Sequence, residues 1–151
     1  MLDNQIFSWQ VRVYYEDTDA GGVVYHSNYL NFMERARTEW LRHLGFEQTD
    51  LRDNLNIVIV IHSLQIAFKK PAKFNDLLTV KSTLTKLGNS SWHCEQSIFR
   101  EDEILIEAQV KAAFVHTQTF KPTRIPAAIL QMAKPLIHKN VINPPLVLEI
   151  P

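Results

Sequence analysis

One long stretch of this 151-residue chain has apolar residues at helical spacing, and it lies between stretches that alternate as strands do. It begins at Ser27 or Asn28, either of which is a reasonable N-cap, and it ends at Gly45, a residue type that often follows the last turn of a helix. Its apolar positions are Leu30, Met33, Trp40, Leu41 and Leu44. This spacing predicts one helix of about four to five turns, whose apolar face must be buried against a neighbouring layer.

The other apolar stretches predict five strands. Residues 7–15 alternate apolar and polar side chains, and strand-forming residues fill 57–68, 77–87, 92–100 and 104–117. Gly88-Asn89 and residues 101–103 are tight-turn sequences, so the last three strands should form a meander. A polar connector follows the long helix, and residues 127–133 predict a short second helix. The chain is therefore predicted to be α+β, with the long helix lying on a five-stranded antiparallel sheet.

Composition limits the possible partners and the location. Sixteen Lys and Arg balance sixteen Asp and Glu, so no net positive charge attracts nucleic acid. The apolar run at 57–61 is far shorter than the roughly 20 residues of a membrane helix, so we do not expect this chain to be an integral membrane protein. Cys94 is the only cysteine and no export signal is visible, which favours a reducing cytoplasm. We expect one domain over residues 1–138 and a mobile tail over 139–151.

The segment from residue 14 to residue 37 is the one that indicates chemistry. A loop carrying Asp17 and Asp19 passes through two glycines and leads directly into the long helix. Unpaired amides and the dipole at a helix start can polarise a carbonyl group, and a neighbouring carboxylate can act as base or nucleophile. That combination suits attack on an acyl group. The structural alternative is that both aspartates are solvated residues of a turn.

Several other motifs can be rejected on spacing. The Asp17-Thr18-Asp19 run lacks the later oxygen ligands of a calcium loop, and Gly21-Gly22 has neither the lysine nor the glycine spacing of a phosphate loop. No serine lies in a nucleophile elbow, and Cys94 lies in a predicted strand, where a packed residue is expected. Four of the six histidines are considered as metal ligands, but they lack metal-ligand spacing, and no metal or cofactor is expected. They are His62, His93, His116 and His138.

The segment also carries a family resemblance. The residues concerned are Tyr15, Asp17, Thr18, Asp19, Gly22, Val23, Val24, Tyr25, Tyr29, Glu34, Ala36 and Arg37. With these residues the chain resembles the 4-hydroxybenzoyl-CoA thioesterase family of hotdog-fold enzymes, in particular its branch of acyl-CoA thioesterases associated with the bacterial Tol-Pal system. The resemblance extends over residues 7–126. It implies a long helix wrapped by the sheet, sheets paired edge to edge in a homodimer or homotetramer, and active sites at the dimer interface.

By this resemblance Asp19 is the catalytic residue of an acyl-CoA thioesterase, which releases a free acid and coenzyme A. Amides near Tyr25 to Tyr29 would receive the developing negative charge on the thioester oxygen. Asp19 would either attack the carbonyl carbon or activate a water molecule, and the sequence leaves both open. Thiolate is a good leaving group, so no strong acid is required.

Further residues are expected to support substrate binding and the loop. Tyr25 is expected to line the acyl pocket, and Tyr29 is also expected to bind substrate. His26 can orient the substrate or water, or it can simply hydrogen-bond the loop. Asp17 and Gly22 are expected to support the loop structurally.

Charged side chains give two weaker expectations. Lys69, Lys70 and Lys73 form a basic cluster that could meet the phosphates of coenzyme A, with solvated surface lysines as the alternative. Glu34 and Arg37 lie three residues apart on the predicted helix, which favours an intrahelical ion pair.

Two other functions compete with the thioesterase. A hotdog dehydratase would need a histidine paired with a helix carboxylate, and no such pair is identifiable. A binding module would hold acyl carrier protein or envelope-linked partners without turnover. The carrier of the acyl group, coenzyme A or acyl carrier protein, stays open.

Overall fold

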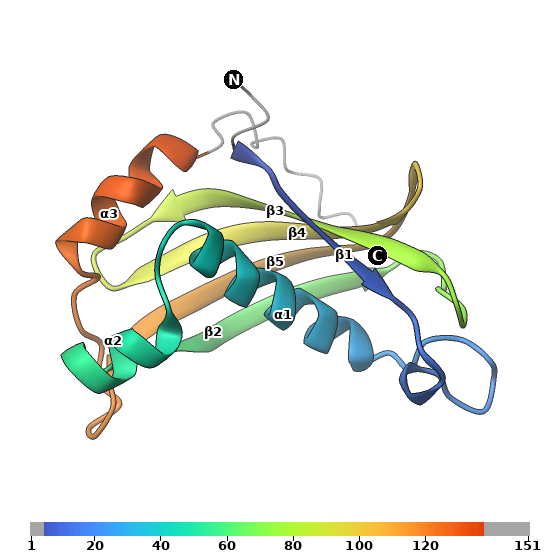
Figure 1. The fold of residues 1–151 in the computed structure, drawn as a ribbon, viewed down its shortest axis with the longest axis horizontal. Helices are drawn as coiled ribbons and strands as arrows, with labels where there is room; N and C mark the ends of the chain where they lie inside the picture. The colour runs from blue at the N-terminus through green and yellow to red at the C-terminus, as the bar shows by residue number, and fades with distance from the viewer. Residues whose placement is uncertain (1–4, 138–151) are drawn as a thin grey trace.

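The structure, a computed structural model, describes residues 5–137 and contains one five-stranded antiparallel sheet with a long helix on one face (Figure 1). Its elements in chain order are β1 (Phe7–Arg12), a 3-10 turn (Tyr15–Asp17), α1 (Asn28–His43), α2 (Gln48–Leu55), β2 (Ile57–Phe68), β3 (Leu77–Leu87), β4 (Ser91–Arg100), β5 (Glu103–His116), α3 (Ala127–Ala133) and a 3-10 turn (Lys134–Leu136). The predicted α+β architecture is confirmed. The expected tail at 139–151 lies outside the described residues, and the domain boundary at 138 stays a prediction.

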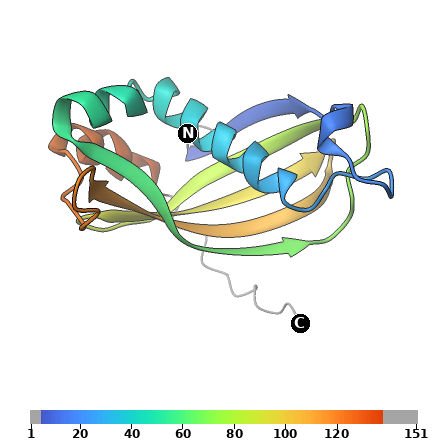
Figure 2. The same ribbon diagram turned by 90° about the horizontal axis from the view of Figure 1, so that it is seen from below.

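The strands are ordered β1-β3-β4-β5-β2. The predicted meander of β3, β4 and β5 forms the centre, and the chain places β1 and β2 at opposite edges. Because α1 connects these two edges, it crosses the face of the sheet between them, as Figure 2 shows. The helix start and the loop before it therefore lie at one end of the sheet.

The core lies between α1 and the sheet. Buried residues alternate along β4 and β5, as the period of two requires, and the small side chains of Ala108 and Ala112 face inward. Trp92 on β4 packs against Trp40 of α1 and against Phe114, with ring centroids 6.3 and 5.5 Å apart. The alanines thus make room for the helix and the large rings fill the space beside it.

Three sequence-based expectations are corrected here. The first strand ends at Arg12 and not at residue 15, because the chain turns at Tyr15–Asp17. The polar connector contains an eight-residue helix, α2, which buries Leu51 and ends at Asn56 in a left-handed conformation with φ of 58°. The spacing also predicts that His62 shares one strand face with Leu64, Ile66 and Phe68. That alternation is interrupted at His62, because a register shift between Ile61 and Ser63 leaves His62 without a directly opposite residue on β5.

Within residues 5–137, no helix is both long and apolar enough to cross a membrane.

Candidate functional site

The loop before α1, residues 13–24 and here called the Asp19 loop, holds Asp19 in a tight turn. The Asp19 amide donates to the Val23 carbonyl at 2.9 Å, and the Gly22 amide donates to the Asp19 carbonyl at 2.9 Å. Gly22 has φ of +83°, a conformation that glycine adopts without strain. The side chain of Asp19 is accessible to solvent, and its Oδ1 accepts a 2.8 Å bond from the Gly21 amide. Its Oδ2 accepts no hydrogen bond from any described residue, so one carboxylate oxygen has no protein partner there.

Asp17 connects this loop to the start of α1. It is buried, its Oδ2 accepts a 2.8 Å bond from the Tyr14 amide, and its Oδ1 accepts a 3.0 Å bond from the side-chain amide of Asn28. The Asp17 carbonyl also accepts a 2.8 Å bond from the Tyr25 amide. The two aspartates therefore differ in environment, with Asp17 fully engaged inside the loop and Asp19 presented to solvent.

The start of α1 leaves backbone donors open. Ser27 occupies the N-cap position, but its side chain makes no capping hydrogen bond. In the described part of the chain, the amides of His26 and Ser27 donate to no acceptor. Unpaired amides at a helix start carry partial positive charge and can receive an anionic oxygen.

Aromatic rings surround this helix start. Tyr25 is 45% exposed, and its ring centroid lies 4.6 Å from that of His26. The ring of Phe68, at the end of β2, lies 6.2 Å from His26 in an edge-on arrangement and 5.9 Å from Tyr29. Phe68 is half exposed and was not expected at the site, since its only signal was its position beside the lysine cluster. The rings of Tyr25 and Phe68 offer apolar surface next to a polar loop.

Tyr29 lies in the first turn of α1 and is buried. Its hydroxyl accepts a 3.0 Å hydrogen bond from the amide of Ala72, in the loop between β2 and β3. Burial raises the pKa of Tyr29 above its ordinary value of 10.0. This hydroxyl therefore stays protonated at neutral pH.

The three lysines of the predicted basic cluster are not equivalent. Lys69 pairs with Glu107 at 3.4 Å, and Lys70 pairs with Glu103 at 2.8 Å. Lys73 has no carboxylate partner among residues 5–137, and its backbone forms a bridge with Val23 of the Asp19 loop. Of the three lysines, Lys73 is thus the one without a carboxylate partner in the described chain, and it is also the one bridged to the Asp19 loop.

Comparison with known proteins identifies the family. A family model described as the thioesterase superfamily matches residues 21–107. The chain belongs to this superfamily. The match contains the helix start, the lysine cluster and strands β2 to β4, so the prediction of an enzyme that hydrolyses thioesters is confirmed.

Individual relatives agree with this membership. The acyl-CoA thioesterase YbgC of Haemophilus influenzae is 45% identical over 129 residues, which is 85% of this chain and 94% of the relative. A probable thioesterase from Bartonella henselae has a TM-score of 0.77 and 37% identity over 80% of this chain and 99% of that chain. A mutant 4-hydroxybenzoyl CoA thioesterase complexed with 4-hydroxybenzoyl CoA shares the fold, with a TM-score of 0.81 at 18% identity over 85% of this chain and 99% of that chain. The expected hotdog fold and family resemblance are confirmed.

The expected ion pair on the thioesterase helix is wrong. Glu34 accepts a 2.7 Å bond from the Thr38 hydroxyl, whereas Arg37 donates a 2.8 Å bond to Oε1 of Gln96, across the interface with β4. Burial lowers the pKa of Arg37 below its ordinary value. Arg37 instead binds the buried side-chain oxygen of Gln96 on β4, and the spacing of residues along the helix cannot predict a partner on another element.

The remaining reactive groups lie away from the Asp19 loop. Burial raises the pKa of Cys94 to about 12, so this thiol is a packed residue. In the part of the chain that the structure describes, no cluster of three His, Cys, Asp or Glu residues is placed to hold a metal ion. His138 lies outside that part.

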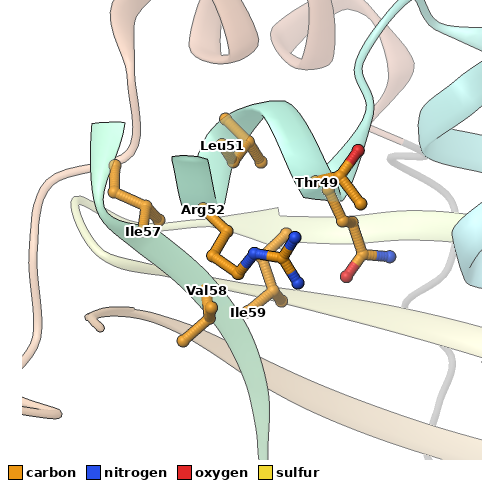
Figure 3. Close-up of a pocket in the computed structure, with 7 residues that line it drawn as sticks. Thr49, Leu51, Arg52, Ile57, Val58 and Ile59 are labelled. Carbon is orange, nitrogen blue, oxygen red and sulfur yellow. The ribbon is translucent and has the colours of Figure 1, made fainter. Parts of the chain in front are cut away.

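A cavity of about 210 Å³ lies where α2 meets the start of β2 (Figure 3). It is lined by Gln48, Thr49, Leu51, Arg52, Ile57, Val58 and Ile59. None of the predicted site residues lines it. Figure 1 places α2 beyond the C-terminal end of α1, so this cavity and the Asp19 loop are at opposite ends of the helix.

Proposed function

We propose that this protein hydrolyses an acyl-CoA thioester to a free acid and coenzyme A, with Asp19 as the catalytic residue. The observation that carries the proposal is the pairing of one free carboxylate oxygen on Asp19 with open amides at the start of the adjoining helix. Membership of the thioesterase superfamily and the 45% identity to an acyl-CoA thioesterase support the substrate class.

In the proposed mechanism the thioester carbonyl oxygen points at the amides of His26 and Ser27. These donors stabilise the negative charge that develops when the carbonyl carbon is attacked, an effect worth on the order of a hundredfold or more in rate. Asp19 either attacks that carbon to give a mixed anhydride, which water then cleaves, or removes a proton from an attacking water. The hydrogen bond from Gly21 to Oδ1 fixes the carboxylate and leaves Oδ2 to react. The thiolate of coenzyme A leaves without a strong acid.

The rings and the lysine cluster are proposed to bind the two halves of the substrate. The exposed ring of Tyr25, with His26 and Phe68 beside it, provides an apolar wall for the acyl group. Lys73, whose ammonium group has no carboxylate partner in the described chain, is the lysine best placed to meet a phosphate of coenzyme A. Lys69 and Lys70 would have to exchange their carboxylate partners for a phosphate.

The assembly and the cellular setting are part of the same proposal. We propose a homodimer or homotetramer in which β2 edges pair, because β2 is an edge strand with Ile61 45% exposed. A cytoplasmic location is proposed from the single cysteine, Cys94, and an association with the Tol-Pal system is proposed from the family resemblance. Acyl carrier protein is the proposed alternative carrier of the acyl group.

The test is release of free thiol from short, long and aromatic acyl-CoA thioesters and from an acylated carrier protein. The wild type should turn over at least one of these classes, and Asp19→Asn should lower kcat by about 100-fold or more because the carboxylate is lost. Asp102→Asn, in the turn between β4 and β5, is the matched control and should retain wild-type rates. Equal rates for wild type and Asp19→Asn on every thioester would reject Asp19 as the catalytic residue. Binding without turnover would favour the binding module.

A further inference from the structure

Ala72 lies at the contact between the start of α1 and two loops. It is fully buried, in the loop of residues 69–76 between β2 and β3, here called the β2–β3 loop. Its amide donates to the hydroxyl of Tyr29 at 3.0 Å, and its carbonyl accepts from the amide of Val24 at 2.9 Å. Both backbone polar groups of this one residue thus connect α1 to the Asp19 loop.

The connection continues to Asp19 itself. The Val23 carbonyl accepts a 2.9 Å bond from the Asp19 amide, and Val23 forms an antiparallel bridge with Lys73, the residue after Ala72. Tyr29, Ala72, Val24, Val23 and Asp19 therefore form a continuous path of three hydrogen bonds and one peptide link. The path starts at Tyr29, in the first turn of α1, and ends at the backbone amide of Asp19.

The far side of the β2–β3 loop is held by the sheet. Arg100 of β4 donates to Oδ2 of Asp76 at 2.8 Å and to the Pro71 carbonyl at 3.3 Å. The first residue of the Asp19 loop holds the same end, since the Val13 amide donates to the Asp76 carbonyl at 2.9 Å. Among the described residues, Tyr29 supplies the side-chain hydrogen bond that holds the same loop to α1. Removal of that hydroxyl would leave the Arg100 and Val13 contacts intact and would remove the side-chain hydrogen bond between this loop and α1.

We propose that Tyr29 is a positioning residue, whose buried hydroxyl acts through Ala72 to fix Asp19 relative to the amides at the start of α1. This inference rests on the proposed function. The carboxylate of Asp19 lies in the loop, whereas the amides that would stabilise the oxyanion lie at the start of α1. Hydrolysis requires a fixed distance between the carboxylate and these amides. A misplacement of about 1 Å can lower the rate by about 100-fold. The role differs from direct substrate binding, because the hydroxyl is buried and occupied by the Ala72 amide.

The first test compares Tyr29→Phe with Tyr15→Phe. The ring left by the first substitution would still pack beside Phe32 and Phe68, so only the hydroxyl is lost. Tyr15 is 77% exposed, and its hydroxyl has no partner in the described chain, so it is the matched control. We expect Tyr29→Phe to lower kcat about 10- to 100-fold while KM stays within about threefold. Tyr15→Phe should leave both constants within about twofold.

Amide hydrogen exchange reports on the contact directly. In Tyr29→Phe the amides of Ala72 and Val24 should exchange at least about tenfold faster, while those of β4 and β5 should keep wild-type protection. Unchanged exchange at Ala72 would overturn the proposal. If Tyr29→Phe fails to fold, a fluorinated tyrosine at position 29 weakens the acceptor without removing it and allows the same comparison of kcat with KM.

A double mutant separates positioning from a merely structural role. If Tyr29 acts through Asp19, Tyr29→Phe should change the residual rate of Asp19→Asn by less than about twofold. Independent, multiplicative losses would overturn the proposal, as would a rise in KM with unchanged kcat. If Asp19→Asn has the wild-type rate, the proposed function fails, whereas the exchange experiment still decides whether Tyr29 holds Ala72.

Discussion

The amide of Gly21 donates a 2.8 Å hydrogen bond to Oδ1 of Asp19, and a Cβ atom at Gly21 would stand only 3.2 Å from that oxygen. The backbone of Gly21 is not in the left-handed region, so space and not conformation disfavours a larger residue here. Gly22 is the opposite case, since it has φ of +83° and open space around it. Two adjacent glycines thus serve the same turn for different physical reasons.

Gly21→Ala should therefore impair catalysis more than folding. The added methyl group displaces the carboxylate of Asp19, and we expect kcat to fall about tenfold with the free energy of unfolding changed by less than about 0.5 kcal/mol. Gly22→Ala should instead lower the free energy of unfolding by about 1 kcal/mol or more, because alanine is strained at positive φ. Thiol release and chemical unfolding of both variants check the two effects. A normal kcat in Gly21→Ala would mean that the carboxylate adapts.

Local patterns predicted most of the fold, because each alternation or helical spacing depends on neighbouring residues. The sheet, the long helix and the position of the loop at Asp19 follow from such patterns. The helix α2 was missed because eight mostly polar residues bury one side chain, Leu51. The pairing of Arg37 with Gln96 and the contact of Tyr29 with Ala72 join residues 59 and 43 positions apart. Such tertiary contacts leave no periodic signal, so this part of the candidate site required the structure.

The lysine cluster gives a prediction about substrate affinity. Lys73→Gln should raise KM for acyl-CoA by about fivefold, or about 1 kcal/mol, because an exposed, unpaired ammonium group is lost. The effect should decline as salt is added. Lys70→Gln is the comparison, and its effect on KM should be smaller because Lys70 already pairs with Glu103. Steady-state kinetics at low and high salt measure both, and a KM unaffected by Lys73→Gln would remove this residue from the substrate site.

Glu103 should make stability depend on pH in the acid range. Hydrogen bonds from Lys70 and Arg100 lower the pKa of Glu103 below its ordinary value of 4.5. A lowered pKa in the folded state stabilises the protein above about pH 4.5, and this contribution is lost as the pH falls through the folded-state pKa. The melting temperature of wild type should therefore exceed that of Glu103→Gln at about pH 6–7, with the difference shrinking below about pH 4. A constant difference across this range would contradict the coupling.

Cys94 should be inert in the folded protein. Its pKa is raised to about 12 by burial, so little thiolate is present at about pH 8 and the sulfur is shielded from reagents. We expect a disulfide reagent to label the native protein at least about 100-fold more slowly than the unfolded protein. Fast labelling of native protein would indicate that β4 opens readily.

Gln96 links the helix to the sheet through a buried polar network. It is fully buried, accepts from Arg37, and donates to the Met33 carbonyl at 3.1 Å and to the Ser82 hydroxyl at 3.0 Å. Gln96→Leu conserves volume but leaves these buried groups without partners, and each such loss costs about 1–3 kcal/mol. We expect the free energy of unfolding to fall by about 2–4 kcal/mol in chemical denaturation.

Gln109→Leu is the matched control for that experiment. Gln109 lies on β5, and its amide binds the carboxylate of Glu95 at 2.7 Å in an exposed contact, so the same substitution there removes only a solvated interaction. The free energy of unfolding should change by less than about 0.5 kcal/mol. Equal effects of the two substitutions would mean that water or side-chain movement satisfies Arg37 when Gln96 is absent. A large loss in Gln96→Leu alone would establish that helix α1 is held on the sheet by polar contacts as well as by apolar packing.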